Sequence, residues 1–120
     1  MNNHSTEEYA AAIQTITSTI TNCEKAQLKF KAGTSQHSLL KNRLNALKIA
    51  KSLLINDEPC QHQNDEIRQA LPPILSIISK CEKAQQKYEE GSVQYRRYVP
   101  LLHAMKLSLS LIEEQLKHIG

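Results

Sequence analysis

The pentapeptide CEKAQ occupies residues 23–27 and recurs at residues 81–85, 58 positions further along the chain. Extending the alignment outward from these two copies matches residues 6–55 with residues 64–113 without a gap. Of the 50 aligned positions, 18 are identical, whereas ordinary residue frequencies would give about three. The sequence therefore predicts an internal duplication, with repeat one at 6–55, a linker at 56–63 and repeat two at 64–113.

Each of these two matched segments has the pattern of a helical hairpin. Apolar positions recur at steps of three and four in the first half of each segment, as on one face of an amphipathic helix. In the first segment this series is Tyr9, Ile13, Ile16, Ile20, Cys23, Gln27 and Phe30. Gly33 and Gly91 are predicted to end the first helix of each hairpin in a left-handed conformation, and Thr34 and Ser92 to cap the second.

Two short-looped hairpins predict an all-α fold, formed by residues 1–120 as a single domain. The simplest packing is an antiparallel four-helix bundle made of two tandem helical-hairpin repeats, related by an approximate internal two-fold axis. Pro72, Pro73 and Pro100 fall inside the helical patterns of the second segment. Since proline lacks a backbone donor and crowds the preceding turn, we expect kinks, or a short first turn and a restart, at these positions.

Composition excludes several classes of protein. The chain has 120 residues, 40% hydrophobic content and a net charge of +3, which suit one folded domain and exclude disordered and fibrous chains. No apolar stretch approaches the roughly 20 residues that span a membrane, and the first residues do not resemble a signal peptide. Three cysteines cannot all pair within one molecule. We therefore expect a cytoplasmic protein without a disulfide framework.

Two pairs of aligned residues belong to the apolar series although their side chains bear thiol or amide groups. Cys23 and Cys81 are predicted to be buried thiols of low reactivity, because burial in apolar surroundings disfavours the thiolate. Gln27 and Gln85, about one turn further along, are predicted to be buried, hydrogen-bonded amides that hold the two hairpins in register.

Signatures of metal, cofactor and catalytic sites are sparse. Cys60, His62, Asp65 and Glu66 offer sulfur, imidazole and carboxylate ligands close together, but the second close pair of ligands that a tetrahedral zinc site usually has is missing. Phosphate-binding glycine loops, nucleophile elbows and dinucleotide fingerprints are also missing. The sequence favours a non-enzymatic role, and we expect no metal, no cofactor and no small-molecule substrate.

A nucleic-acid function is the alternative. Arg97 and His103 have an R-x5-H spacing, which resembles the motif of HEPN-type ribonucleases, themselves helical bundles. The resemblance covers these two residues and implies that they are catalytic, although Tyr98 stands where the family commonly has a polar residue. The first segment also carries basic residues that could contact phosphates: Lys25, Lys29, Lys31, Lys41, Arg43, Lys48 and Lys51. Because stacking aromatics are few, a solvated basic face is favoured.

The two segments diverge in a consistent direction at five aligned positions. Polar residues of the first segment, Thr17, Thr19, Lys41, Arg43 and Lys51, are replaced in the second by Leu75, Ile77, Val99, Leu101 and Leu109. Some of these apolar side chains must face outward, and an exposed apolar surface usually marks a partner site. The sequence therefore predicts a small interaction or regulatory module that binds a protein partner, or a second copy of itself, through the second hairpin. The partner and the pathway are not specified.

Overall fold

The computed structural model describes residues 6–55 and 64–119, which form four helices and no strand. The helices are α1 (Thr6–Gln27), α2 (Ser35–Ile55), α3 (Asn64–Gln85) and α4 (Val93–Ile119). The all-α class and the four helices predicted from apolar periodicity are thus confirmed for this part of the chain. None of these helices is both long and apolar enough to cross a membrane.

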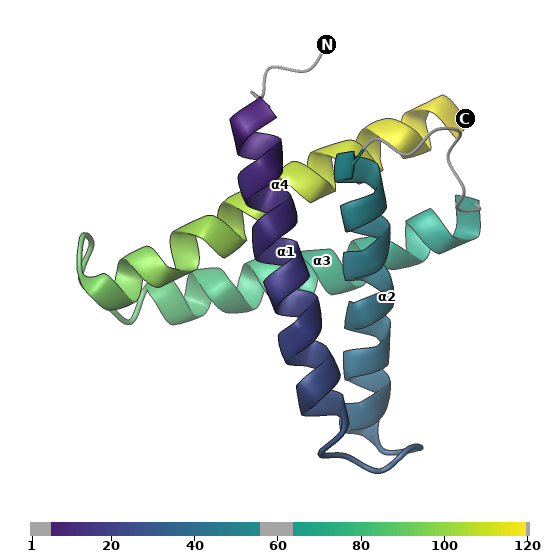
Figure 1. Cartoon of the computed structure of the whole chain (residues 1–120), viewed down its shortest axis with the longest axis horizontal. Helices are drawn as coiled ribbons and strands as arrows, with labels where there is room; N and C mark the ends of the chain where they lie inside the picture. The colour runs from purple at the N-terminus through teal and green to yellow at the C-terminus, as the bar shows by residue number, and fades with distance from the viewer. Residues whose placement is uncertain (1–5, 56–63, 120) are drawn as a thin grey trace.

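The helices form two antiparallel hairpins that lie across one another (Figure 1). Helix α2 packs on α3 and α4, and α1 packs on α4. The overall dimensions are 40 × 39 × 21 Å, so the two long axes are nearly equal and the thickness is that of two helices, each about 10–12 Å across. The first hairpin therefore crosses the second instead of running alongside it, which is how the structure differs from the aligned bundle expected from the sequence.

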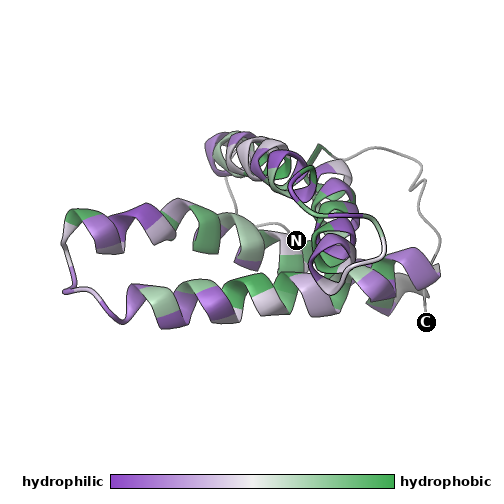
Figure 2. Ribbon diagram, turned by 90° about the horizontal axis from the view of Figure 1, so that it is seen from below, coloured by the Kyte–Doolittle hydropathy of each residue, from purple (hydrophilic) through white to green (hydrophobic). Residues whose placement is uncertain are grey.

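Small residues are prominent in the core that the two hairpins share. Five alanines are at most 2% exposed, and a side chain of one carbon lets helix backbones approach closely. They are Ala12, Ala46, Ala50, Ala70 and Ala104. Away from the crossing the hairpin turns project freely, and Figure 2 shows hydrophobic and polar residues alternating along the projecting arm of the second hairpin.

The core is built from large aliphatic side chains of all four helices. Those that are fully buried include Ile16, Leu47, Ile67, Ile74, Met105 and Ile112. Burying each such side chain stabilises the fold by roughly 1.5–3 kcal/mol. One polar residue shares this core: Ser108 is 0% exposed, and its hydroxyl donates a hydrogen bond of 2.8 Å to the Ala104 carbonyl one turn earlier.

The two hairpin turns contain the predicted left-handed glycines, but these glycines do not end the first helices. Gly33 has φ 92° and Gly91 has φ 88°, which confirms the predicted conformation. Helices α1 and α3 nevertheless end at Gln27 and Gln85, six residues earlier. Bonds to the third preceding carbonyl, such as Lys29 N–H to Ala26 at 3.1 Å, tighten and terminate the last turn. The position predicted for these two helix ends was therefore wrong.

The predicted caps of the second helices are confirmed. The Thr34 hydroxyl accepts a hydrogen bond of 3.2 Å from the His37 backbone N–H. The Ser92 hydroxyl accepts one of 3.1 Å from Tyr95. The expected restart at the prolines is not seen, since α3 runs through Pro72–Pro73 and α4 through Pro100 without interruption.

Candidate functional site

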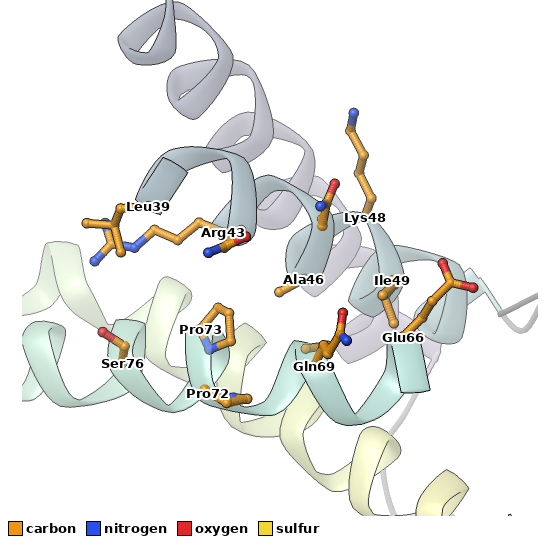
Figure 3. A pocket seen from close by; sticks show the side chains of 13 residues that line it. Leu39, Arg43, Ala46, Lys48, Ile49, Glu66, Gln69, Pro72, Pro73 and Ser76 are labelled. Atoms are coloured by element: carbon orange, nitrogen blue, oxygen red, sulfur yellow. The ribbon is translucent and has the colours of Figure 1, made fainter. Parts of the chain in front are cut away.

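A cleft of about 820 Å³ opens between α2 and α3, near the crossing of the hairpins (Figure 3). Its charged groups are Arg43 and Lys48 from α2 and Glu66 from α3. Amide and hydroxyl groups from both helices also line it, and its apolar walls come from Ala46, Ile49, Ala70, Pro72 and Pro73. The volume lies in the range of about 300–1,000 Å³ found for small-molecule sites.

Arg43 is the unusual residue of this cleft. Its Nε and Nη2 atoms are buried and make no hydrogen bond with any of the residues that the structure describes. A buried donor without a partner costs about 1–3 kcal/mol, and more when the group is charged. The aligned residue of the second segment is Leu101, which packs against the core. The sequence indicated that Arg43 is basic and is replaced by leucine in the second segment, but neither observation predicted a buried guanidinium group.

The two described cysteines are free thiols. Cys81 is buried, as predicted, whereas Cys23 is only half-buried, so the prediction was wrong for Cys23. Burial raises the pKa of both thiols above the ordinary value of 9.0, and the positive charge of Arg43 opposes this rise at both. Arg43 therefore lies close enough to both thiols to affect their ionisation.

Gln85 is half-buried, and its amide nitrogen donates a hydrogen bond of 3.2 Å to the Tyr95 carbonyl. This bond joins α3 to α4 inside one hairpin. The predicted role of holding the two hairpins in register was therefore wrong for Gln85, because its partner is on the adjacent helix of the same hairpin. Gln27 is half-buried at the corresponding place in α1.

The five residues predicted to form a partner-binding face divide into three groups. Leu75 and Val99 are 49% and 48% exposed. Leu101 and Leu109 are half-buried and pack against the core. Ile77 is 7% exposed and belongs to the core, so it is not available to a partner. Position on the helix explains this division, because Ile77 lies one turn after the core residue Ile74.

Leu75 and Val99 lie on the same face of the second hairpin. Leu75 precedes Glu82 on α3 by seven residues, and Val99 precedes Lys106 on α4 by seven, which is about two turns in each helix. Glu82 and Lys106 contact each other across the hairpin at 3.3 Å. We call these four residues, Leu75, Glu82, Val99 and Lys106, the diagonal face. The cleft is elsewhere, since none of them lines it.

Arg97 and His103 point to different sides of α4. Their separation of six residues sets them about 120° apart around a helix. His103 Nε2 lies 3.3 Å from the Glu8 carboxylate of α1, and Arg97 is exposed. Of the basic residues on α2, Lys41 is exposed and does not line the cleft, whereas Lys48 is exposed at the cleft and Arg43 is half-buried in it.

The metal ligands considered in the sequence are not assembled in the described residues. Cys60 and His62 lie outside them, and Asp65 and Glu66 are exposed near the start of α3. Within residues 6–55 and 64–119, no three histidine, cysteine, aspartate or glutamate side chains are grouped so that they could hold a metal ion.

Comparison of the chain with protein-family models, with curated proteins and with solved structures found no match.

Proposed function

We propose that this protein is a helical interaction module that binds a second copy of itself through the diagonal face of its second hairpin. The observation that carries the proposal is the exposure of Leu75 and Val99 on that face, 49% and 48% respectively. Their counterparts in the first segment are Thr17 and Lys41. At these two aligned positions the apolar character is therefore specific to the second hairpin and is not needed for a hairpin to form.

The arrangement of the diagonal face favours a second copy as its partner. Leu75 and Val99 lie on opposite sides of the Glu82–Lys106 contact along the hairpin, because the two helices are antiparallel and each residue precedes its charged neighbour by seven positions. A two-fold axis in the plane of this face, perpendicular to the line from Leu75 to Val99, would set Leu75 of one copy over Val99 of the other. Such a surface complements itself in its apolar contacts, as an isologous interface requires.

The dimer is weak on this proposal, because the free energy gained by burial and the cost of association are of similar size. Two half-exposed aliphatic side chains from each copy contribute at most a few kcal/mol of burial at roughly 25 cal/mol per Å². Association costs about 4 kcal/mol or more in lost translational and rotational freedom. Self-association is therefore expected to depend on protein concentration.

The proposal includes the internal duplication and an approximate two-fold relation between the hairpins. Support comes from the turns, where hydrogen bonds recur 58 residues apart: Phe30 N–H to Gln27 and Tyr88 N–H to Gln85 both measure 3.1 Å. A two-fold rotation that superposes the two hairpins would exchange the α1–α4 contact with the α2–α3 contact, and both contacts are present. A cytoplasmic location is also part of the proposal, and the free thiols of Cys23 and Cys81 are compatible with it.

Sedimentation velocity over a range of concentrations tests the proposal. Replacing Leu75 with threonine and Val99 with lysine introduces the residues found at aligned positions 17 and 41. We expect the wild type to dimerise and this variant to remain monomeric, with an unchanged circular-dichroism spectrum.

The matched control makes the same chemical changes at other exposed sites, Leu28→Thr and Val93→Lys, which are 87% and 64% exposed. This control should dimerise like the wild type. A wild type that stays monomeric at the highest concentration, or a control that loses association equally, would overturn the proposal.

A further inference from the structure

We propose that the cleft between α2 and α3 binds a small organic carboxylate, held by the guanidinium group of Arg43. The site is separate from the diagonal face, so this inference does not depend on self-association. It rests on the position and chemistry of the groups that line the cleft.

The first argument is the unpaired state of Arg43. Two of its donors are buried without hydrogen-bond partners among residues 6–55 and 64–119, which is destabilising. A leucine would avoid this cost, and Leu101 shows that leucine is compatible with the aligned position of a closely similar hairpin. A ligand that accepts hydrogen bonds from these two donors would explain why an arginine occupies this position.

The second argument is which donors are unpaired. Nε and Nη2 lie on one edge of the planar guanidinium group, and their N–H bonds are parallel. This edge matches the two oxygens of a carboxylate, giving two charge-assisted hydrogen bonds at once. Because this edge is buried, a carboxylate reaches it only when a neighbouring side chain moves aside. Leu39 lies one turn before Arg43, lines the same cleft and is itself 45% exposed (Figure 3).

The third argument concerns the rest of the ligand. Arg43 and Lys48 outnumber Glu66 by one charge in the cleft, which favours a monoanion over a doubly charged phosphate ester. Asn42, Asn45, Gln69 and Ser76 provide further hydrogen-bonding groups. The ring surfaces of Pro72 and Pro73 provide an apolar wall (Figure 3). A carboxylate attached to an apolar body therefore fits the lining better than an inorganic anion.

The experiment measures thermal unfolding of the full chain with benzoate, hexanoate or inorganic phosphate, each against chloride at the same ionic strength. A ligand that binds only the folded protein raises the melting temperature as its concentration increases. We expect benzoate or hexanoate to do so in the wild type, and phosphate to do so less.

Variants of Arg43 assign the effect to this residue. Arg43→Leu should fold at least as stably as the wild type without ligand and show no carboxylate-induced shift. Arg43→Lys keeps the charge but lacks the two-donor edge, and should bind about tenfold more weakly, or worse, in a direct NMR titration. The control Lys41→Leu removes the same charge from an exposed neighbour on α2 that does not line the cleft, and should respond like the wild type.

Three results would overturn the proposal. One is the absence of any carboxylate-specific shift in the wild type. Another is an equal shift in Arg43→Leu, or retained affinity in Arg43→Lys if the leucine variant does not fold. The last is a phosphate response equal to or larger than the carboxylate response, which would make the cleft a general anion site.

Discussion

Lys106 Nζ on α4 lies 3.3 Å from the carboxylate of Glu82 on α3, and each of these residues follows an exposed apolar residue of its own helix, Val99 or Leu75, by seven positions. Both members of this ion pair are about half exposed, at 57% and 45%. Exposed ion pairs of this kind contribute about 0.2–1 kcal/mol to folding. The contact is therefore a minor contribution to the fold, and its position at the centre of the diagonal face is its more informative property.

The positive-φ glycines of the turns give a prediction about stability. An added Cβ at Gly33 or Gly91 meets nothing within 4 Å, so replacement by alanine introduces backbone strain without a clash. Left-handed conformation costs a residue with a Cβ about 1–2 kcal/mol. Gly33→Ala and Gly91→Ala should each lower the free energy of unfolding in urea by about 1 kcal/mol, equally at both turns. Asparagine, which tolerates this region better, should cost less at each. If the alanine variants are as stable as the wild type, the left-handed conformation assigned to these glycines is contradicted.

Local features of the fold were predictable because they depend on neighbouring residues. Steps of three and four among apolar residues indicated the helices, and Thr34 and Ser92 indicated the caps that the backbone hydrogen bonds confirm. The crossing of the hairpins was not predictable by this route. It depends on how buried small residues of distant segments, such as Ala46 and Ala104, are placed in the shared core, and periodicity within one helix does not specify that placement.

The site was less predictable than the fold, for a related reason. The comparison of Leu75 and Val99 with Thr17 and Lys41 indicated two exposed apolar residues, but also included Ile77, which lies in the core. The sequence alone does not distinguish an apolar substitution that extends the core from one that leaves an apolar side chain exposed at the surface. For Arg43 the error is the opposite one. A charged residue is expected at the surface, but two nitrogens of this side chain are buried.

Ionisation of the two described thiols provides a pH-dependent prediction. Burial raises the pKa of Cys23 and Cys81 above the ordinary value of 9.0. The unfolded chain therefore releases these protons at a lower pH than the folded chain. The stability associated with these thiols should be complete below about pH 9 and decline as the pH rises through the raised native values. Urea unfolding of Cys23→Ala/Cys81→Ala should show a weaker alkaline decline than the wild type.

The charge of Arg43 near these thiols can be tested separately. Because this charge lowers the pKa of both, Arg43→Leu should raise both values further and slow alkylation by iodoacetamide at a fixed alkaline pH. The measurement uses a Cys60→Ser background, so that only two thiols react. Lys41→Leu serves as the control and should alkylate at the unchanged rate. Faster alkylation in Arg43→Leu would indicate that the arginine acts by covering the thiols instead of by its charge.

The paired prolines of α3 lead to the last prediction. Pro72 and Pro73 lie inside an uninterrupted helix and lack the N–H groups that would bond the carbonyls of Arg68 and Gln69 four residues earlier. The aligned residues of α1 are Gln14 and Thr15, which occur within a helix of the same length. The double variant Pro72→Gln/Pro73→Thr therefore restores two helical donors with residues that a similar hairpin already accommodates.

An interior proline disfavours a helix by about 3 kcal/mol, but the residues around Pro72 and Pro73 already accommodate their rings. We therefore expect this double variant to be more stable by about 1–3 kcal/mol. Thermal unfolding should shift upward by several degrees. Pro100→Asn, which takes the residue at aligned position 42 and restores one donor in α4, should give a smaller gain. If Pro72→Gln/Pro73→Thr is destabilised while Pro100→Asn is stabilised, contact of the proline rings with the cleft wall outweighs the missing hydrogen bonds. The two prolines would then be retained for the shape of the cleft, and the carboxylate-induced shift should fall in the same variant.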